Sequence, residues 1–378
     1  REIMRLFYKS EKQFIMKQSK LFSLPLLASL LSFSLQAQTP TDNIFYNLDE
    51  KTKTAEVTNS ADKYSGDISI PEKIILNDTE YTVTSIGKEA FKDCTSLTNI
   101  ILPNSITKID EAAFSGCTSL LNVTIPSSVT VLGYNAFQNC TALTECLLPN
   151  SVTQIGNYPF YGCISLTTPV YNNKFFAYLP TTYEGEYNIP EGIETIVGGA
   201  FRLCTSLTSV KLPKSLSYIG NQSFRQCSAL TTVTIMSNVI DNIGTLAFNN
   251  CSALNTIYIY TETLPTKTAA DAFSNVPVTE VILYVPSGMA STYQGADVWK
   301  NFGSIIDTPT SIDDIKISDK PWATIVDGGI YIQAEQWEIY NFNGTLLKKG
   351  HQPQTVTLQT GLYIIHNLKK GLQKVWIK

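Results

Sequence analysis

Hydrophobic residues recur along this chain with a period of about 23 residues. The repeating unit reads I-G-x-x-A-F-x-x-C-x-x-L-x-x-I-x-L-P-x-x-(I/V/L), and residues 109–120, IDEAAFSGCTSL, are one copy of its first part. Its phenylalanines are Phe91, Phe114, Phe137, Phe160, Phe201, Phe224 and Phe248, with a weaker copy at Phe273. A fixed period in the twenties is typical of a solenoid with one supersecondary unit per repeat.

Each part of the unit predicts a local structure. Residues 97–102 end with the two-residue alternation of a short strand. Pro103 ends that strand because proline has no backbone donor, and residues 106–109 return the chain along another side of the coil. Gly87 is suited to a tight turn there. Stacked coils would pair their strands in parallel, so the pattern predicts a mainly parallel β solenoid with short turns or helices.

This repeat resembles the leucine-rich repeats of the BspA-like surface antigens found in Bacteroidetes and spirochaetes. The resemblance covers about residues 43–305, in which seven copies keep Phe, Cys, Leu and the strand aliphatics at matching offsets. It implies an exported, surface-exposed protein that binds macromolecules or other cells. It does not name a ligand.

The repeat is interrupted between Phe160 and Phe201, which are 41 residues apart. We place an insertion at residues 170–187, whose aromatic residues are Tyr171, Phe175, Phe176, Tyr178, Tyr183 and Tyr187. Insertions in repeat proteins often lie on a binding face, and Asn172, Asn173, Glu184 and Glu186 could help to hold a sugar or peptide. The alternative is an enlarged coil whose aromatic side chains fill its own core. The strand-like segment FFAYLP favours this second interpretation.

The outward face of the predicted strands is a second candidate binding surface. One outward position per strand is occupied in turn by Ile101, Thr124, Leu147, Val170, Lys211, Thr234 and Tyr258. With its neighbours, this face is rich in Thr, Ser and Asn and low in charge. Such a face suits hydrogen bonding to a protein or glycan, but threonine is also favoured in any exposed strand.

Seven of the eight cysteines share one repeat position, and Cys146 occupies a strand position instead. The seven are Cys94, Cys117, Cys140, Cys163, Cys204, Cys227 and Cys251. A zinc site would need paired ligands at short spacing, and the repeat region has no histidine. Regular disulfides are disfavoured because equivalent side chains in a stack point the same way. We therefore interpret the seven cysteines as a buried structural ladder in which each thiol meets a backbone carbonyl.

The two ends of the chain differ from the repeats. Lys17 and Lys20, the apolar residues 21–35 and then Ala37 have the layout of a secretory signal, and residues 1–15 precede its methionine, Met16. We expect cleavage after Ala37. Residues 38–85 would form a β-rich N-terminal entry or cap, and residues 86–305 the repeats with their insertion and a C-terminal cap.

Residues 306–320 are polar and predict a linker, and residues 321–378 predict a small β-sandwich. Within the sandwich, Asn343-Gly344 between alternating segments is a strong hairpin signal. The segments IYNFNG (339–344) and GLYII (361–365), with a terminal strand ending at Lys378, resemble the C-terminal sorting domains of type IX secretion in Bacteroidetes. This resemblance covers the tail alone and implies a sorting signal of the kind that can be cleaved on export.

Composition narrows the function further. The 378 residues are 43% hydrophobic and 16% charged, with a formal net charge of −4. Removal of residues 1–37, which hold six Lys or Arg and two acidic residues, would make the net charge about −8. A basic stripe for nucleic acid is therefore not expected, and no segment of the mature chain is apolar enough to span a bilayer.

Catalytic motifs are absent from the sequence. The two histidines, His351 and His366, both lie in the tail, so the repeats hold no Ser–His or Cys–His dyad. We expect no metal, no cofactor and no catalysis, and a partner that is an extracellular protein, cell or glycan. Two alternatives stay open: a surface glycan hydrolase using an acid pair such as Glu184 and Glu186, and a structural surface component without a ligand.

Overall fold

The computed structural model describes residues 39–41, 43–308, 323–326, 329–341, 346–358, 361–367 and 371–377. The predicted signal peptide and most of the predicted linker lie outside these residues. The described helices are short: α2 (Ala290–Gly295) and the 3₁₀ turns η1 (Val278–Glu280) and η2 (Trp299–Asn301).

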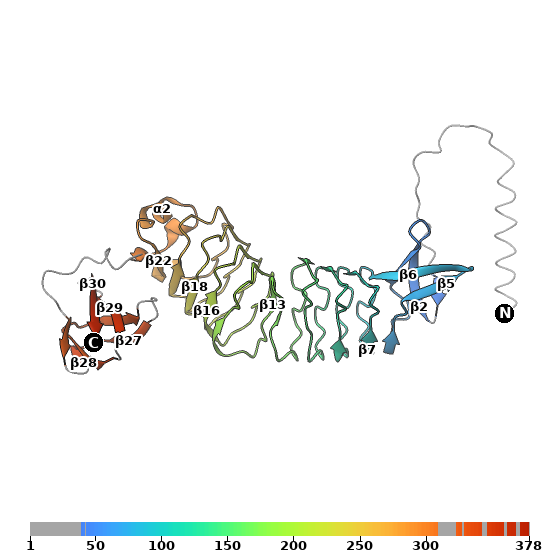
Figure 1. Cartoon of the computed structure of the whole chain (residues 1–378), viewed down its shortest axis with the longest axis horizontal. Helices are drawn as coiled ribbons and strands as arrows, with labels where there is room; N and C mark the ends of the chain where they lie inside the picture. The colour runs from blue at the N-terminus through green and yellow to red at the C-terminus, as the bar shows by residue number, and fades with distance from the viewer. Residues whose placement is uncertain are drawn as a thin grey trace, which may run out of the picture. The chain divides into compact units, whose positions relative to one another are not determined.

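The repeats form a continuous stack of β coils, as the sequence predicts (Figure 1). Most coils contribute one strand to each of two sides of the stack, and equivalent strands pair in parallel. On one side lie the strands that we call the longer strands, of which only β9 has as few as two residues: β4 (Gly66–Ser69), β7 (Leu97–Ile101), β9 (Asn122–Val123), β14 (Gly185–Asn188), β16 (Leu207–Leu212), β18 (Thr232–Ile235), β20 (Thr256–Ile259), β22 (Ile282–Pro286) and β23 (Ser304–Thr308). The shorter strands are β8 (Lys108–Ile109), β10 (Val131–Leu132), β11 (Gln154–Ile155), β15 (Thr195–Ile196), β17 (Tyr218–Ile219), β19 (Asn242–Ile243) and β21 (Lys267–Thr268).

The N-terminal entry is a β structure that continues into the coils. Its strands are β1 (Thr39–Thr41), β2 (Ile44–Asp49), β3 (Thr54–Thr58), β5 (Lys73–Leu76) and β6 (Thr79–Ile86). Strand β3 pairs in parallel with β6, and β6 then pairs in parallel with the short strand β8 of the first repeat. The first coil therefore has a hydrogen-bonded neighbour on its N-terminal side.

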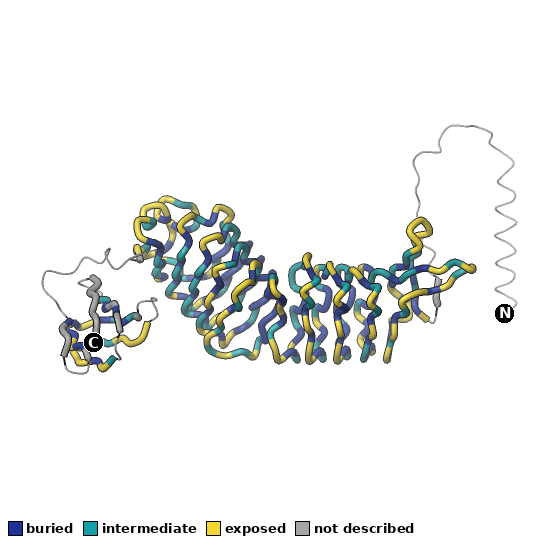
Figure 2. Tube along the Cα trace, in the orientation of Figure 1, coloured by how far each residue is buried: buried dark blue, intermediate teal, exposed yellow. Residues whose placement is uncertain are grey.

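Buried positions recur from coil to coil along the repeats (Figure 2), and their aromatic side chains stack in a column. The ring of Phe114 lies parallel to those of Phe91 and Phe137, with centroids 5.1 Å away in each case. Because all these rings are fully buried, each coil covers the apolar face of the next.

The repeat glycines have a different role from the predicted tight turn. A Cβ atom added to Gly133 would lie 2.3 Å from the carbonyl carbon of Asp110 in the preceding coil, and one on Gly220 would lie 2.4 Å from the nitrogen of Gly198. Neither glycine has a positive φ. Glycine is needed here because the backbones of successive coils approach too closely for any side chain.

The insertion forms an additional coil. Strand β12 (Val170–Tyr171) pairs antiparallel with β13 (Phe175–Tyr178), β13 pairs in parallel with β15, and β14 begins a new sheet of longer strands. Phe176 stacks on Phe201 with centroids 4.8 Å apart, so it supplies the ladder ring of this coil. Two hydrophobic clusters meet here, one reaching the insertion from the N-terminal side and one starting at Phe176.

The last coil is closed by the segment that contains α2 and η2. Tyr293, Trp299 and Phe302 are buried in it, and the Phe302 ring lies 5.2 Å from that of Phe273. Strand β23 pairs with β22 through Thr308. Residues 306–308 therefore belong to the last sheet rather than to the predicted linker.

The tail contains two small sheets in the order β24-β25-β28 and β27-β26-β29-β30. The strands are β24 (Ala323–Val326), β25 (Gly329–Ile332), β26 (Trp337–Asn341), β27 (Leu346–Gly350), β28 (Gln354–Thr357), β29 (Gly361–Asn367) and β30 (Gly371–Ile377). All their pairings are antiparallel. They have their own core around Trp337, Ile339 and Ile365.

Candidate functional site

Equivalent outward positions on one side of the coils, in and between two separate sheets of the longer strands, together form what we call the strand-face column. Its members are Ile101, Thr124, Leu147, Asn188, Lys211, Thr234, Tyr258, Tyr284 and Ile306. Strand pairing places Lys211 beside Thr234 and Thr234 beside Tyr258. The column therefore brings together residues that are distant in sequence at the spacing of paired strands, about 4.8 Å.

Large apolar side chains in this column are open to solvent. Ile101 is 66% exposed and Leu147 is 75% exposed. Tyr258 and Tyr284 stack with ring centroids 4.7 Å apart, and Lys211 is exposed between the two apolar ends of the column. Isolated exposed aliphatic residues are common, but Ile101 and Leu147 occupy equivalent positions two coils apart on one side of the solenoid, and such a pair resembles part of the apolar centre of a protein interface.

Val170 does not belong to this column. The sequence places it among the outward positions, whereas the structure buries it to 1% exposure in β12. Its hairpin partner in the pairing is Tyr178, which is also buried. The reason is the inserted coil, which changes the direction of the chain after Leu166.

Much of the polar surface on this face is already hydrogen-bonded within the protein. The side chains of Thr98 and Asn99 both donate to the carboxylate of Asp67. The hydroxyl of Thr231 donates to the carbonyl of Thr208 one coil earlier, at 3.0 Å. These groups therefore join neighbouring coils, which reduces their capacity to recognise a ligand.

The aromatic residues of the insertion do not form one exposed cluster. Phe175, Phe176 and Tyr178 are 7%, 0% and 3% exposed, so the prediction that they line a binding surface is corrected. They are buried because the insertion is a coil that needs its own core. The Tyr178 hydroxyl donates to the carbonyl of Cys163 at 3.0 Å, which satisfies the buried phenol.

The other aromatic residues of the insertion remain accessible. Tyr171 is 42% exposed and stacks on Phe176, while Tyr183 and Tyr187 are partly exposed and meet edge to face with centroids 5.2 Å apart. The Tyr183 hydroxyl donates to the Glu186 carbonyl at 2.7 Å. These three tyrosines lie at the surface of the inserted coil, Tyr171 in the sheet of the short strands and Tyr187 in β14.

Asn172 serves the fold rather than a ligand. Its Nδ2 donates to the carbonyls of Pro149 and Val152, and its Oδ1 accepts from the amides of Lys174 and Phe175. The side chain thus closes the β12–β13 turn and joins it to the preceding coil. In contrast, Glu184 and Glu186 are exposed and lack the apolar enclosure that a glycosidase acid needs.

The cysteine ladder is buried and all eight cysteines are free. Most thiols donate to the carbonyl of the phenylalanine one coil earlier, rather than to the turn before their own strand. These contacts are Cys117 to Phe91, Cys140 to Phe114, Cys163 to Phe137, Cys227 to Phe201 and Cys251 to Phe224, at 3.0–3.1 Å. Cys204, which follows the insertion, has longer contacts of 3.7 Å and 3.8 Å to the carbonyls of Leu179 and Pro180.

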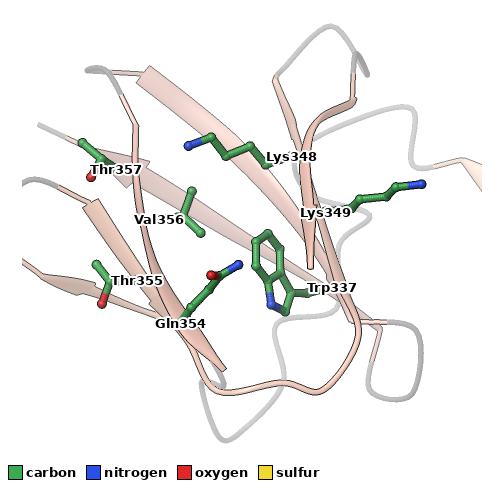
Figure 3. A pocket seen from close by; sticks show the side chains of 7 residues that line it. All are labelled: Trp337, Lys348, Lys349, Gln354, Thr355, Val356 and Thr357. Carbon is green, nitrogen blue, oxygen red and sulfur yellow. The ribbon is translucent and has the colours of Figure 1, made fainter. Parts of the chain in front are cut away.

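A hollow of about 390 Å³ lies in the tail between the edge strands β27 and β28. Trp337 forms its floor, and its indole nitrogen donates to the Gln352 carbonyl at 2.9 Å. Figure 3 shows Lys348 extending across the hollow towards Val356 and Thr357, whereas Lys349 points away. Because Trp337 is only 1% exposed, its indole acts mainly as core.

Neither a metal-binding cluster nor a membrane-spanning helix occurs among the described residues. Among these residues, no three His, Cys, Asp or Glu side chains come together in a way that could hold a metal ion. Within the same residues, no helix has the length and apolar character needed to cross a membrane.

Solved structures with a similar arrangement are bacterial leucine-rich repeat proteins. A leucine rich cell surface protein from Faecalibacterium prausnitzii A2-165 is 22% identical, over 72% of this chain and 94% of that chain, with a TM-score of 0.36. A leucine-rich repeat protein from T. pallidum is 25% identical, over 57% and 90% of the two chains, with a TM-score of 0.40. One from Bacteroides ovatus ATCC 8483 is 21% identical, over 72% and 89%, with a TM-score of 0.38.

The family of this chain is identified from its sequence rather than from these structural similarities. No curated protein matches the sequence. The model of the BspA type Leucine rich repeat region matches residues 69–183 and 171–294, and it comprises six copies of the repeat. These two ranges together span more than half of the chain. The coils, their ladders and this match show that the chain belongs to the family of BspA-type leucine-rich repeat proteins.

Proposed function

We propose that the protein is an exported, non-catalytic surface protein that binds an extracellular protein through the strand-face column. The observation that carries this proposal is the exposure of Ile101 and Leu147, at 66% and 75%, at equivalent repeat positions on one side of the coils. Burial of such side chains against a partner would release water from apolar surface, which favours association. Lys211 and the Tyr258–Tyr284 pair would add polar and aromatic contacts further along.

Family membership supports the export and adhesion part of this proposal. A surface location would need a signal and an attachment, for which residues 1–37 and the tail at 321–378 are the candidates. We propose that the tail serves sorting by type IX secretion, as expected in Bacteroidetes. Protease treatment of intact cells tests the location, because a protein protected inside the periplasm could not act as an adhesin.

Substitution of the exposed aliphatic residues tests the binding surface. We expect the mature protein to bind at least one member of an extracellular-matrix protein panel saturably, and the double variant Ile101→Asp, Leu147→Asp to lose about tenfold or more in affinity, measured by biolayer interferometry. Two carboxylates in the apolar centre of the interface would be buried without a partner.

The matched control is Ile75→Asp, since Ile75 is 67% exposed but lies on the β5 hairpin. Equal losses in the control and in the double variant would contradict a specific strand-face interface. Absence of saturable binding to the whole panel would favour a structural surface component.

A glycan hydrolase is the second candidate, and the exposure of Glu184 and Glu186 gives it less support. It predicts turnover of a glycan panel that is lost in Glu184→Gln and Glu186→Gln. Turnover by the unmodified protein would overturn the non-catalytic proposal.

A further inference from the structure

Two arginines and three tyrosines come together on a side of the solenoid that the repeat motif leaves unexplained. We call this group the Arg–Tyr cluster: Tyr134, Tyr158, Tyr161, Arg202 and Arg225. Tyr161, Arg202 and Arg225 occupy the equivalent position in their repeats, directly after Phe160, Phe201 and Phe224. They lie in the turn segments between the short strands and the next long strands, so the cluster does not include the strand-face column.

The inserted coil brings the two halves of the cluster together. Although Tyr158 and Gly198 are 40 residues apart, the Tyr158 amide donates to the Gly198 carbonyl at 2.8 Å. A Cβ atom on Gly199 would lie 2.3 Å from the Tyr158 ring, so only glycine leaves room for this tyrosine. The Arg202 guanidinium consequently lies over the Tyr161 ring, 4.5 Å from its centroid.

The two guanidinium groups have no counter-charge among the residues that the structure describes. Arg202 Nη1 and Arg225 Nη1 both donate to Gln222 Oε1, at 3.1 Å and 3.0 Å, so these two nitrogens are at most about 6 Å apart. Neither arginine has an ion pair with any described residue. Both Nε atoms are buried and have no hydrogen-bond partner. Two like charges that share one neutral amide repel each other, and an anion between them would remove that repulsion.

The tyrosines extend from this pair of charges towards solvent. Tyr158 meets Tyr161 edge to face with centroids 6.4 Å apart, and Tyr134 meets Tyr158 in the same way at 5.5 Å. Tyr134 is 41% exposed. Burial raises the pKa of Tyr158, while the positive charges of Arg202 and Arg225 act on its hydroxyl in the opposite direction, which shows how near they are.

We propose that the Arg–Tyr cluster is a binding site for an acidic sugar unit of an extracellular polysaccharide. The carboxylate or sulfate of the sugar would lie against the two guanidinium groups, whose planar fork matches both anions. The ring would pack on the tyrosines, which offer an apolar body and a hydroxyl at one site. An acidic peptide would use the arginines but would not need the adjoining row of rings, and so we favour the sugar.

Binding of defined polymers to the mature protein tests the proposal. The probes are chondroitin sulfate, which carries sulfate and carboxylate, hyaluronan, which carries only carboxylate, neutral dextran and poly-glutamate. Using isothermal titration calorimetry, we expect saturable binding of at least one acidic polysaccharide, weakening as salt rises, and none of dextran. Binding of chondroitin sulfate alone would identify sulfate as the recognised group, whereas binding of both would identify the carboxylate. If poly-glutamate bound as tightly as the acidic polysaccharides or more tightly, the ligand would be an acidic peptide and the proposal of an acidic sugar would be wrong.

Substitutions locate the site. Arg202→Gln and Arg225→Gln should each lower the affinity about tenfold or more, while Lys214→Gln, which removes the same charge from an exposed position, should leave it unchanged. Arg225→Lys keeps the positive charge but loses the planar guanidinium group, so it should also weaken binding. Because this variant keeps the charge, it is a second test of the site if the glutamine variants fail to fold. Equal effects of Arg225→Gln and Lys214→Gln, or no binding of either acidic polysaccharide, would overturn the proposal.

The test of the Arg–Tyr cluster can succeed or fail independently of the proposed protein binding through the strand-face column. The variant Ile101→Asp, Leu147→Asp should keep its affinity for the acidic polysaccharide, because those residues lie on the side of the coils that carries the longer strands, outside the Arg–Tyr cluster. If that variant lost polysaccharide binding while Arg225→Gln retained it, the sugar site would belong to the strand face instead.

Discussion

At the scale of single residues, the most regular feature is the cysteine ladder. A thiol is small enough to fit between stacked coils and can donate a weak hydrogen bond to a buried carbonyl. The five contacts of 3.0–3.1 Å show this arrangement in coil after coil. Repetition of the cysteine therefore follows from repetition of its surroundings.

The first prediction concerns thiol reactivity. Burial raises the pKa of both Cys146 and Cys204 to about 12, so the thiolate fraction of each near pH 8 should be roughly a thousandfold lower than in an unfolded chain. We expect the native protein to resist alkylation by iodoacetamide over the pH range 7–9, as measured by mass spectrometry.

The denatured but unreduced protein serves as the control for that experiment. It should release all eight thiols, because none of the cysteines is bridged. Fewer than about six titratable thiols would show that disulfides form and would contradict the ladder.

At the scale of an element, the inserted coil decides which aromatic residues are available for binding. Phe176 takes over the ladder position, although nothing in the segment VYNNKFFAYLP matches the repeat motif. The coil is held by backbone pairing of β13 with β15 and by the four hydrogen bonds of Asn172. A segment with the composition of a binding loop is therefore largely core.

The second prediction tests this assignment of Asn172. Asn172→Ala should lower the free energy of unfolding by about 2 kcal/mol or more, since two buried carbonyls and two amides lose their partner. Chemical denaturation monitored by circular dichroism measures the change. Asn173→Ala is the matched control, because the Asn173 side chain is exposed. A similar small effect of both substitutions would show that the β12–β13 turn does not depend on Asn172.

At the scale of the whole molecule, the repeats behave as a stack in which each coil is stabilised by its two neighbours. The last coil lacks one neighbour, and the segment around α2 and η2 covers it with Tyr293, Trp299 and Phe302. Loss of these covering side chains should lower the stability of the last coil most, and that of the preceding coils progressively less. The two hydrophobic clusters that meet at the inserted coil provide a boundary where the effect should diminish.

The third prediction uses this boundary. Trp299→Ala should destabilise the C-terminal cluster by about 3–5 kcal/mol, and hydrogen exchange should show lost protection mainly in β18, β20 and β22. Strands β7 and β8, in the other cluster, should keep their protection. Trp337→Ala, which removes an equally buried tryptophan from the tail core, is the control and should leave the exchange of the repeats unchanged. Uniform loss of protection along all coils would show that the repeats unfold as one unit.

The sequence by itself determined the period, the parallel β coils and the inward position of each repeated Phe, Cys and Leu. It could do so because every coil offers its residues nearly the same surroundings. The position of a residue within the repeat motif therefore predicts whether its side chain points inward or outward. Ile101, Leu147 and Lys211 were placed on the outer face for the same reason, and they are exposed there.

Only the tertiary structure decided which side chains are buried and how the chain runs where the 23-residue period is interrupted. Val170 and Phe175 turn inward, and the repeat glycines allow close approach of backbones rather than tight turns. Arg202 was not distinguished by the sequence, since its neighbours Tyr161 and Tyr158 precede it by about 40 residues across an insertion. The physical reason is that contacts between coils depend on the path of the inserted chain, and that path is set by packing around Phe176 and Asn172, not by any repeating pattern.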